Sequence, residues 1–319
     1  MLRNFIFWLS TKKSVTGPLA ERGMRYGFAR RFIAGESLED ALAASKELNQ
    51  ESRAVSLNHL GENVTTADAA RQVSESYISM LRALDREKLD GNISIKLTQL
   101  GLDFDAGFCK VFAREIAAAA AAMGRSVEMD MEGAAYTEKT LSIFEAVQRE
   151  FPGTGLAVQA YLHRTADDLE RLAVLKPKLR LVKGAYREPP SVAVQKKRQV
   201  DENYAKLAAT LLDGRFFPAI ATHDLAMLDH ARAVIRERKI PTDKYEFQMI
   251  YGIRRDLQAQ IRGQGHALRI YVPFGTEWCP YFMRRLSERP ANCAFVIRNL
   301  LAESFRSHPQ PAGDRRDAR

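Results

Sequence analysis

Short apolar runs alternate with longer amphipathic stretches from about residue 54 onward. Each run has four or five residues, a length typical of strands that are buried on both faces. We predict strands at Ala54–Leu57, Ile93–Leu97, Val127–Met131, Leu156–Ala160, Leu179–Val182, Pro218–Ala221, Tyr245–Met249 and Leu268–Val272. Eight strand–helix units in about 250 residues indicate an α/β protein, a distorted (β/α)8 barrel of the TIM type with N-terminal helices. An open, doubly wound sheet is the main alternative.

The stretches between the runs carry helix signals. Three segments, Ser37–Asp40, Thr65–Asp68 and Thr165–Asp168, have the spacing of a capping box, in which a hydroxyl and a carboxylate cap the first turn of a helix. The alanine-rich run Ala117–Ala122 predicts helix as well, because alanine has the highest helix propensity.

Patterning divides the chain into three parts. Residues 1–50 contain helical periodicity and no strand, and they form a predicted helical segment that packs on the barrel. Residues 51–306 form the predicted catalytic barrel. Residues 307–319, which combine Pro309, Pro311 and Gly313 with mixed charge, form a predicted disordered tail.

Composition narrows the class of protein. The hydrophobic share of 46% and the charged share of 27% are ordinary for a globular enzyme, and no apolar run reaches the roughly 20 residues that span a bilayer. Three cysteines without CxxC spacing argue against a disulfide framework or a zinc ribbon and fit the cytoplasm. The net charge of +9 is scattered and not interleaved with aromatic residues, so nucleic-acid binding is excluded. A loose peripheral attachment to the inner face of the membrane stays open.

A polar residue stands near the carboxyl end of each predicted strand. These residues are Asn58, Lys96, Asp130, Gln159, Lys183, His223, Gln248 and Tyr271. Barrel enzymes build their active sites at this end from several strands, so the eight positions predict an active site. Lys96 and Asp130 lie inside apolar runs, where a charge needs a partner, and we expect them to pair with each other. A purely structural salt bridge is the alternative for this pair.

A second candidate site follows the last strand. The spacing of Tyr281, Arg284, Arg285 and Glu288 places all four on one helical surface. Two adjacent guanidinium groups can hold a carboxylate from two sides, so this helix predicts a site for a small anion. A solvated amphipathic helix is the alternative.

Several site classes have no support in the sequence. The six histidines are dispersed and no His-x-His occurs, so no metal site is expected. Neither a Gly-x-Gly-x-x-Gly after a strand nor a Gly-x-Ser-x-Gly elbow is present. A barrel with lysines, an aspartate, tyrosines and an arginine pair suits a Schiff-base lysine enzyme or a cofactor-dependent reaction on an amino or carboxylic acid.

At these residues the chain resembles the flavin-dependent proline dehydrogenase family. The matching segments are Ser94–Gly101, Asp130–Glu132, Gln159–Leu162, Arg180–Tyr186, Ala221–Asp224, Glu246–Gly252, Arg269–Gly275 and Tyr281–Glu288. They occur in family order over about residues 50–300. The resemblance implies a distorted (β/α)8 barrel that holds FAD, in agreement with the strand pattern.

The resemblance also implies residue roles. The catalytic residues would be Lys96, Asp130 and Arg180. The substrate pocket would comprise Lys96, Ala185, Ile250, Tyr271, Tyr281, Arg284 and Arg285, with the arginine pair on the substrate carboxylate. The FAD contacts would be Asp130, Gln159, Arg180, Val182, Lys183, Gly184, Ala185, Tyr186, Thr222, His223 and Glu288. Ile250 and Asn58 depart from the family, where Leu and Asp are frequent, and the second departure puts a charged role at position 58 in doubt.

The implied reaction is oxidation of L-proline to Δ1-pyrroline-5-carboxylate, with a hydride passing to FAD N5 and electrons leaving for a quinone or another acceptor. A separate pyrroline-5-carboxylate dehydrogenase would take the product. Three alternatives remain: a lyase or aldolase with a Schiff base on Lys96 or Lys183, oxidation of a related cyclic imino acid, and an anion-binding module without a cofactor.

Overall fold

A computed structural model describes residues 29–61 and 64–278. The chain divides into two compact units, Phe32–Glu277 and a second unit composed of Met1–Arg31 and Trp278–Arg319. Almost all described residues belong to the first unit. The predicted tail, residues 307–319, lies outside the described residues, as do the first 28 residues of the predicted N-terminal segment.

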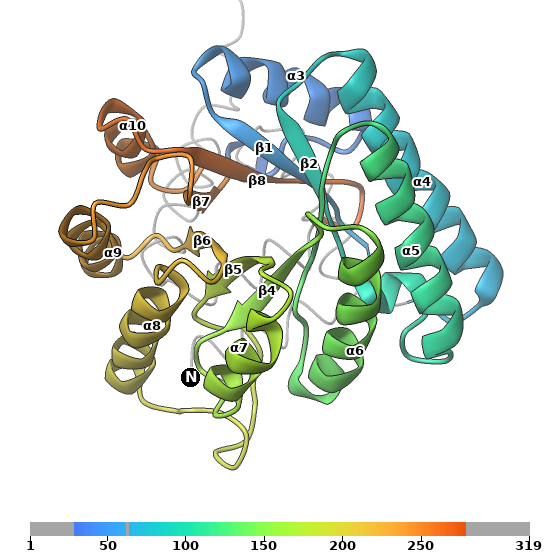
Figure 1. Cartoon of the computed structure of the whole chain (residues 1–319). Coiled ribbons are helices and arrows are strands. Elements are labelled where there is room, and N and C mark those ends of the chain that lie inside the picture. The colour runs from blue at the N-terminus through green and yellow to red at the C-terminus, as the bar shows by residue number, and fades with distance from the viewer. Residues whose placement is uncertain (1–28, 62–63, 279–319) are drawn as a thin grey trace, which may run out of the picture. The chain divides into compact units, whose positions relative to one another are not determined.

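Eight parallel strands form a closed barrel in the order β1-β2-β3-β4-β5-β6-β7-β8 (Figure 1). The strands are β1 (Ala54–His59), β2 (Gly91–Ile95), β3 (Val127–Met129), β4 (Gly155–Gln159), β5 (Lys178–Val182), β6 (Phe217–Ala221), β7 (Glu246–Ile250) and β8 (Leu268–Phe274). Closure is explicit in the register, since Ala54 on β1 pairs with Arg269 on β8. This pairing confirms the barrel and excludes the open, doubly wound sheet.

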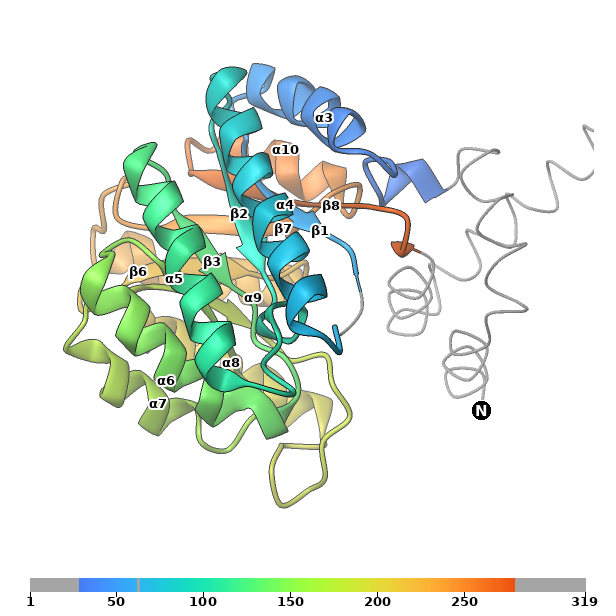
Figure 2. The same ribbon diagram turned by 90° about the vertical axis from the view of Figure 1, so that its right-hand side faces the viewer.

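The helices that precede and connect the strands surround the barrel. Those in the described part of the chain are α3 (Leu38–Gln50), α4 (Ala67–Arg86), α5 (Ala106–Ala122), α6 (Ala134–Glu150), α7 (Thr165–Ala173), α8 (Lys197–Leu211), α9 (Leu225–Glu237) and α10 (Arg255–Gly263). Short 3-10 turns occur at η1 (Ala29–Arg31) and η2 (Leu97–Leu100). Figure 2 shows α4 and α5 side by side along the outside of the barrel. None of the described helices is both long and apolar enough to cross a membrane.

Helix α3 precedes the first strand and packs on β1 and β8. It buries Ala41, Leu42 and Leu48 in the main hydrophobic cluster. Its first turn confirms the predicted capping box, because Ser37 Oγ accepts from the Asp40 N–H while the Asp40 side chain accepts from the Ser37 N–H.

The other two predicted capping boxes are wrong. At α4 the capping hydroxyl belongs to Thr66, which accepts from the Ala69 N–H, and Thr65 lies one residue outside the cap. At α7 the N-cap is Arg164, while Thr165 is already helical and turns its hydroxyl to the Gln159 carbonyl oxygen at 2.6 Å.

Successive side chains of each strand point alternately outward, to the helices, and inward, to the barrel interior, and the two sets differ in polarity. The outward residues, such as Val55, Leu57, Ile93 and Ile95, are apolar and lie in the single large cluster formed with the helices. The inward residues are different from those of most barrels, whose interiors are filled by branched apolar side chains. They include long charged side chains on β3, β5, β7 and β8, at Glu128, Lys178, Arg180, Glu246 and Arg269.

Small residues on β4 and β6 make room for these long side chains. A Cβ atom at Gly155 would lie 2.7 Å from Glu128 Cγ, so no larger residue fits there. Ala157 and Ala219 flank Arg180 in the register of β4, β5 and β6. From β3 to β7, strands with small inward residues therefore alternate with strands that carry long charged side chains, and the interior is a polar network.

Candidate active site

Arg180 lies at the centre of the polar network. It is inward-facing on β5 and 5% exposed. Its Nη1 group donates to Asp130 Oδ1 at 2.6 Å, and its Nη2 group donates to Ser94 Oγ at 2.7 Å and to Glu128. Side chains from β2 and β5 and from the segment of β3 thus meet on one guanidinium group, which leaves it little freedom to rotate.

Tyr271 completes the contacts of Asp130. The Tyr271 hydroxyl donates to Asp130 Oδ2 at 2.7 Å, and the Arg180 guanidinium lies 5.3 Å from the centre of the Tyr271 ring. Both oxygens of Asp130 are therefore engaged, by β8 and β5. The predicted pairing of Lys96 with Asp130 is wrong, because the ion-pair partner of Asp130 in the described part of the chain is Arg180.

Lys96 directly follows β2 and is half-buried. Its backbone is held on two sides: the Lys96 N–H donates to the Tyr77 hydroxyl at 3.3 Å, and Glu132 accepts from both the N–H and the hydroxyl of Thr98. These contacts fix the start of the turn η2. Lys96 is thereby placed at the carboxyl end of the barrel, as the sequence predicts.

Lys183 follows β5 and carries two ion pairs. Its ammonium group contacts Asp201 on α8 and lies 2.7 Å from Asp224, the N-cap residue of α9. Lys197 contacts Asp201 as well. The four side chains form a balanced group of two cations and two carboxylates at the carboxyl end of β5 and β6.

The loop after Lys183 contains the next predicted contacts. Gly184 has φ +116°, and a Cβ atom there would collide with the Tyr161 ring, so glycine is required at this position. Val182 is the last residue of β5, while Ala185 and Tyr186 are exposed.

Four further predicted residues lie at neighbouring strand ends. Gln159 donates to the Glu132 carbonyl oxygen at 2.9 Å, and Thr222 accepts from the Asp224 N–H at 3.1 Å. His223 accepts the Ile250 N–H through Nε2 at 2.9 Å. A nitrogen that accepts carries no proton, so the neutral ring has its proton on Nδ1. Ile250 ends β7 and is half-buried.

The predicted helix with the arginine pair lies beyond the part of the chain that the structure describes. Tyr281, Arg284, Arg285 and Glu288 lie outside the described residues. Their predicted roles remain predictions. Within the described residues, no group of three or more His, Cys, Asp or Glu side chains is placed to hold a metal ion.

The network beneath Arg180 keeps its carboxylates charged. Burial alone would raise the pKa of Glu128, but the cations Arg180, Lys178 and Arg269 hold it well below its usual range. Burial likewise opposes the charge of Arg180, and Glu128 and Asp130 raise its pKa further above its usual value. Both groups therefore remain ionised inside the barrel.

Glu132 behaves in the opposite way. Burial raises the pKa of Glu132, and the two hydrogen bonds from Thr98 offset only part of this effect. A carboxyl group whose folded-state pKa is raised stabilises the fold below its unfolded-state pKa and loses this contribution as the pH rises through the folded-state value.

Replacing Glu132 by Gln should therefore change the pH dependence of stability. We expect the free energy of unfolding of Glu132→Gln to gain on that of the parent protein as the pH rises above about 4.5, the usual glutamate value. Urea unfolding at pH 4 and pH 7 measures the gain, with the exposed Glu115→Gln as control. Equal pH slopes for Glu132→Gln and the parent would contradict the assignment.

Sequence reasoning missed the charged residues deeper in the barrel. Glu128, Lys178, Glu246 and Arg269 each stand two residues before a predicted site residue or polar strand end, at Asp130, Arg180, Gln248 and Tyr271. Because strand side chains alternate with a period of two, this spacing places each pair on the same inner face. The signal was present, and only the strand ends were considered.

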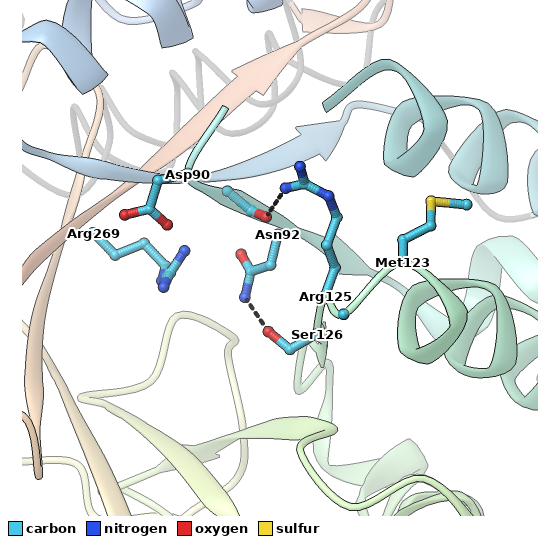
Figure 3. A pocket seen from close by; sticks show the side chains of 8 residues that line it. Asp90, Asn92, Met123, Arg125, Ser126 and Arg269 are labelled. Atoms are coloured by element: carbon cyan, nitrogen blue, oxygen red, sulfur yellow. Dashed lines mark hydrogen bonds between the residues drawn. The ribbon is translucent and has the colours of Figure 1, made fainter. Parts of the chain in front are cut away.

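A cavity of 340 Å³ lies at the opposite, amino end of the strands, lined by residues that include Asp90, Asn92, Arg125 and Arg269 (Figure 3). The terminal N–H groups of Arg125 donate to the carbonyl oxygens of Leu84, Leu89 and Gly91 and to Asp85. These contacts tie the segment before β3 to the end of α4 and the start of β2. Barrel enzymes act at the other end, so we regard this cavity as structural.

Fold and site together define a (β/α)8-barrel enzyme with Lys96, Asp130 and Lys183 at the carboxyl ends of its strands and a network of buried charges beneath them. A family model for proline dehydrogenase matches residues 41–298. Proline dehydrogenase 1 of Bacillus subtilis subsp. natto is 39% identical over 94% of this chain and 99% of its own length. The proline dehydrogenase of Deinococcus radiodurans is 36% identical over 88% of this chain and 92% of its own length.

Solved structures agree. Proline utilization A from Bdellovibrio bacteriovorus, inactivated by N-propargylglycine, superposes with a TM-score of 0.78 at 27% identity, over 85% of this chain and 33% of that one. This chain thus spans about a third of the length of that protein. The chain belongs to the proline dehydrogenase family, and it is an oxidoreductase of proline catabolism.

Proposed function

We propose that this protein oxidises L-proline to Δ1-pyrroline-5-carboxylate with FAD as its cofactor and passes the electrons to a quinone-type acceptor. The observation that carries the proposal is the convergence of Lys96, Asp130, Arg180 and Tyr271, from four different strands or strand ends, at the carboxyl end of a family barrel. Charge, a phenol and an ammonium group gathered there suit a small zwitterionic substrate.

The residues at this end fit a flavin. Arg180 Nε is buried without a hydrogen-bond partner among the described residues, so the guanidinium retains a donor for a further group. Lys183 offers a cation for a phosphate, and Gln159, Thr222 and His223 supply polar side chains around it. When bound, FAD would supply an acceptor for the hydride at N5.

The protein's part is to bind and orient. Arg284 and Arg285 would hold the proline carboxylate, and Ile250 and Ala185 would form apolar sides of the pocket around the proline ring. Tyr271 is fixed by its hydrogen bond to Asp130, so its ring can confine the substrate without a change of rotamer. The remaining predicted contacts, Asp130, Val182, Gly184, Tyr186 and Glu288, would line the cofactor.

Location and partners follow from the same proposal. A quinone acceptor would lie in a membrane, so a cytoplasmic protein of net charge +9 would make peripheral contact with the anionic inner face. The imine product would pass to a separate pyrroline-5-carboxylate dehydrogenase.

A dye-reduction assay tests the proposal. Purified protein with L-proline should reduce an artificial two-electron acceptor and form an imine that o-aminobenzaldehyde traps, one imine per two electrons. A lyase or aldolase would instead be trapped covalently by borohydride with a carbonyl substrate at Lys96 or Lys183. Covalent trapping without dye reduction would overturn the proposed oxidation of proline.

Tyr281 should decide the choice between proline and 4-hydroxyproline. It precedes Arg284 by one helical turn in the predicted helix, so its ring would project over the substrate ring and exclude a hydroxyl group. We expect Tyr281→Ser to weaken proline turnover and to raise kcat/KM for hydroxyproline relative to that for proline. The change in the free energy of discrimination between the two substrates should be about 1–3 kcal/mol at most. Kinetics on both substrates measure the ratio, and a ratio that does not move would place Tyr281 outside the pocket.

A further inference from the structure

Glu128 is the most heavily engaged carboxylate beneath the candidate site. It lies in the middle of β3 and is 1% exposed. It accepts from Arg180, from Lys178 Nζ at 2.8 Å, from Asn92 Nδ2 at 2.8 Å and from Gln248 Nε2 at 3.2 Å. Four strands therefore contribute to one buried anion.

The second deep carboxylate, Glu246, makes a different set of contacts. Its partners among the described residues are Lys178 at 2.8 Å, Gln248 at 2.6 Å and Arg269 at 3.1 Å. Arg180 is not among them. The barrel thus contains two carboxylates of equal charge, of which Glu128 touches the guanidinium of the candidate site and Glu246 does not.

The six ion-paired side chains around Arg180 and Glu246 balance in charge. Glu128, Asp130 and Glu246 carry three negative charges, and Lys178, Arg180 and Arg269 carry three positive ones. Buried charges are screened much less than exposed charges, so the loss of any one of them leaves a net field inside the barrel. Glu128 is the deep charge in direct contact with Arg180.

We propose that Glu128 is a positioning residue that orients Arg180 and sets its effective charge, and thereby sets the reduction potential of the bound flavin. The inference rests on the proposed function. Reduction of a flavin by a hydride adds two electrons and one proton, so the ring system gains one negative charge. A less neutralised Arg180 would stabilise that charge and raise the potential.

Four variants test the sign of this effect. Glu128→Gln keeps the shape and removes the anion, so the midpoint potential should rise, by about tenfold in the equilibrium constant for reduction, or about 30 mV for a two-electron couple. Lys178→Met removes the second cation that pairs with Glu128, so Glu128 neutralises Arg180 more fully and the potential should fall. The double variant restores the balance and should return close to the parent value. Glu246→Gln is the matched control and should shift the potential less than half as much as Glu128→Gln.

Spectroelectrochemistry of the flavin-loaded protein gives the potentials, and thermal unfolding of each variant reports structural damage separately. Mere damage cannot shift the potential in opposite directions for Glu128→Gln and Lys178→Met. If Glu128→Gln does not fold, Lys178→Met decides together with Glu246→Gln, because Lys178 pairs with both carboxylates. A downward shift in Lys178→Met that is larger than the upward shift in Glu246→Gln supports the role of Glu128, and a smaller one overturns it. Equal shifts in Glu128→Gln and Glu246→Gln, or an unchanged potential in Lys178→Met, would overturn the role of Glu128. A parent protein that takes up no flavin would overturn the proposed function, and this inference with it.

Discussion

Replacing Arg180 by Met should lower the free energy of unfolding by about 3–5 kcal/mol, because the buried Glu128 and the half-buried Asp130 lose an ion-pair partner at once. Proline oxidation should also fail, since the same side chain is proposed to contact the flavin. Arg180→Lys should recover only part of the stability, because one ammonium group cannot reproduce the planar fork that reaches Asp130, Ser94 and Glu128 together. Urea unfolding measures the loss.

The loss of stability in Arg180→Met should become smaller as the pH falls. The pKa of Glu128 is depressed in the folded protein, so its stabilising contribution is present above the unfolded-state pKa and disappears as the pH falls through the folded-state value. The difference between parent and Arg180→Met should therefore shrink in acid. Arg198→Met, on an exposed arginine paired with Glu202, is the control and should change stability little at any pH. A loss that is equally small in both variants would show that the barrel tolerates an unpaired carboxylate.

Replacing Arg285 by Met should cost about 2–5 kcal/mol of transition-state stabilisation, because the substrate carboxylate would be left half-paired. Arg285→Lys should restore part of this loss, since a point charge replaces a bidentate fork. The measurement is kcat/KM for L-proline, with the far-ultraviolet circular dichroism of each variant as a check on folding.

A matched control separates substrate binding from general charge effects. Arg198→Met removes one positive charge from an exposed helical position and should leave kcat/KM unchanged. An unchanged kcat/KM in Arg285→Met as well would mean that the arginine pair is ordinary surface charge.

The fold was predictable because the barrel depends on a repeated local pattern. Each apolar run corresponds to an observed strand, and the boundaries differ by at most two residues, as at β3, which ends at Met129 instead of Met131. The caps at Thr66 and Arg164 were not predictable in the same way. At α4, Thr65 and Thr66 have equal local propensity for the cap, and at α7 Thr165 lies inside the helix and donates its hydroxyl to the Gln159 carbonyl oxygen.

The site was predictable in its location and only partly in its contacts. Strand polarity places Lys96, Asp130 and Tyr271 at one end of the barrel, and the structure agrees. The partner of Asp130 could not be read from adjacency along the sheet, because Arg180 reaches it from β5, across the barrel interior. Such a contact depends on side-chain length and on the small residues Gly155 and Ala157 that leave room for it.

The visible spectrum of the purified protein, recorded anaerobically before and after addition of L-proline, tests the central claim most directly. We expect a yellow protein with bound FAD whose flavin bands bleach on addition of L-proline. Stoichiometric FAD that L-proline does not bleach would contradict the proposed reaction, although the barrel and its charged interior would stand.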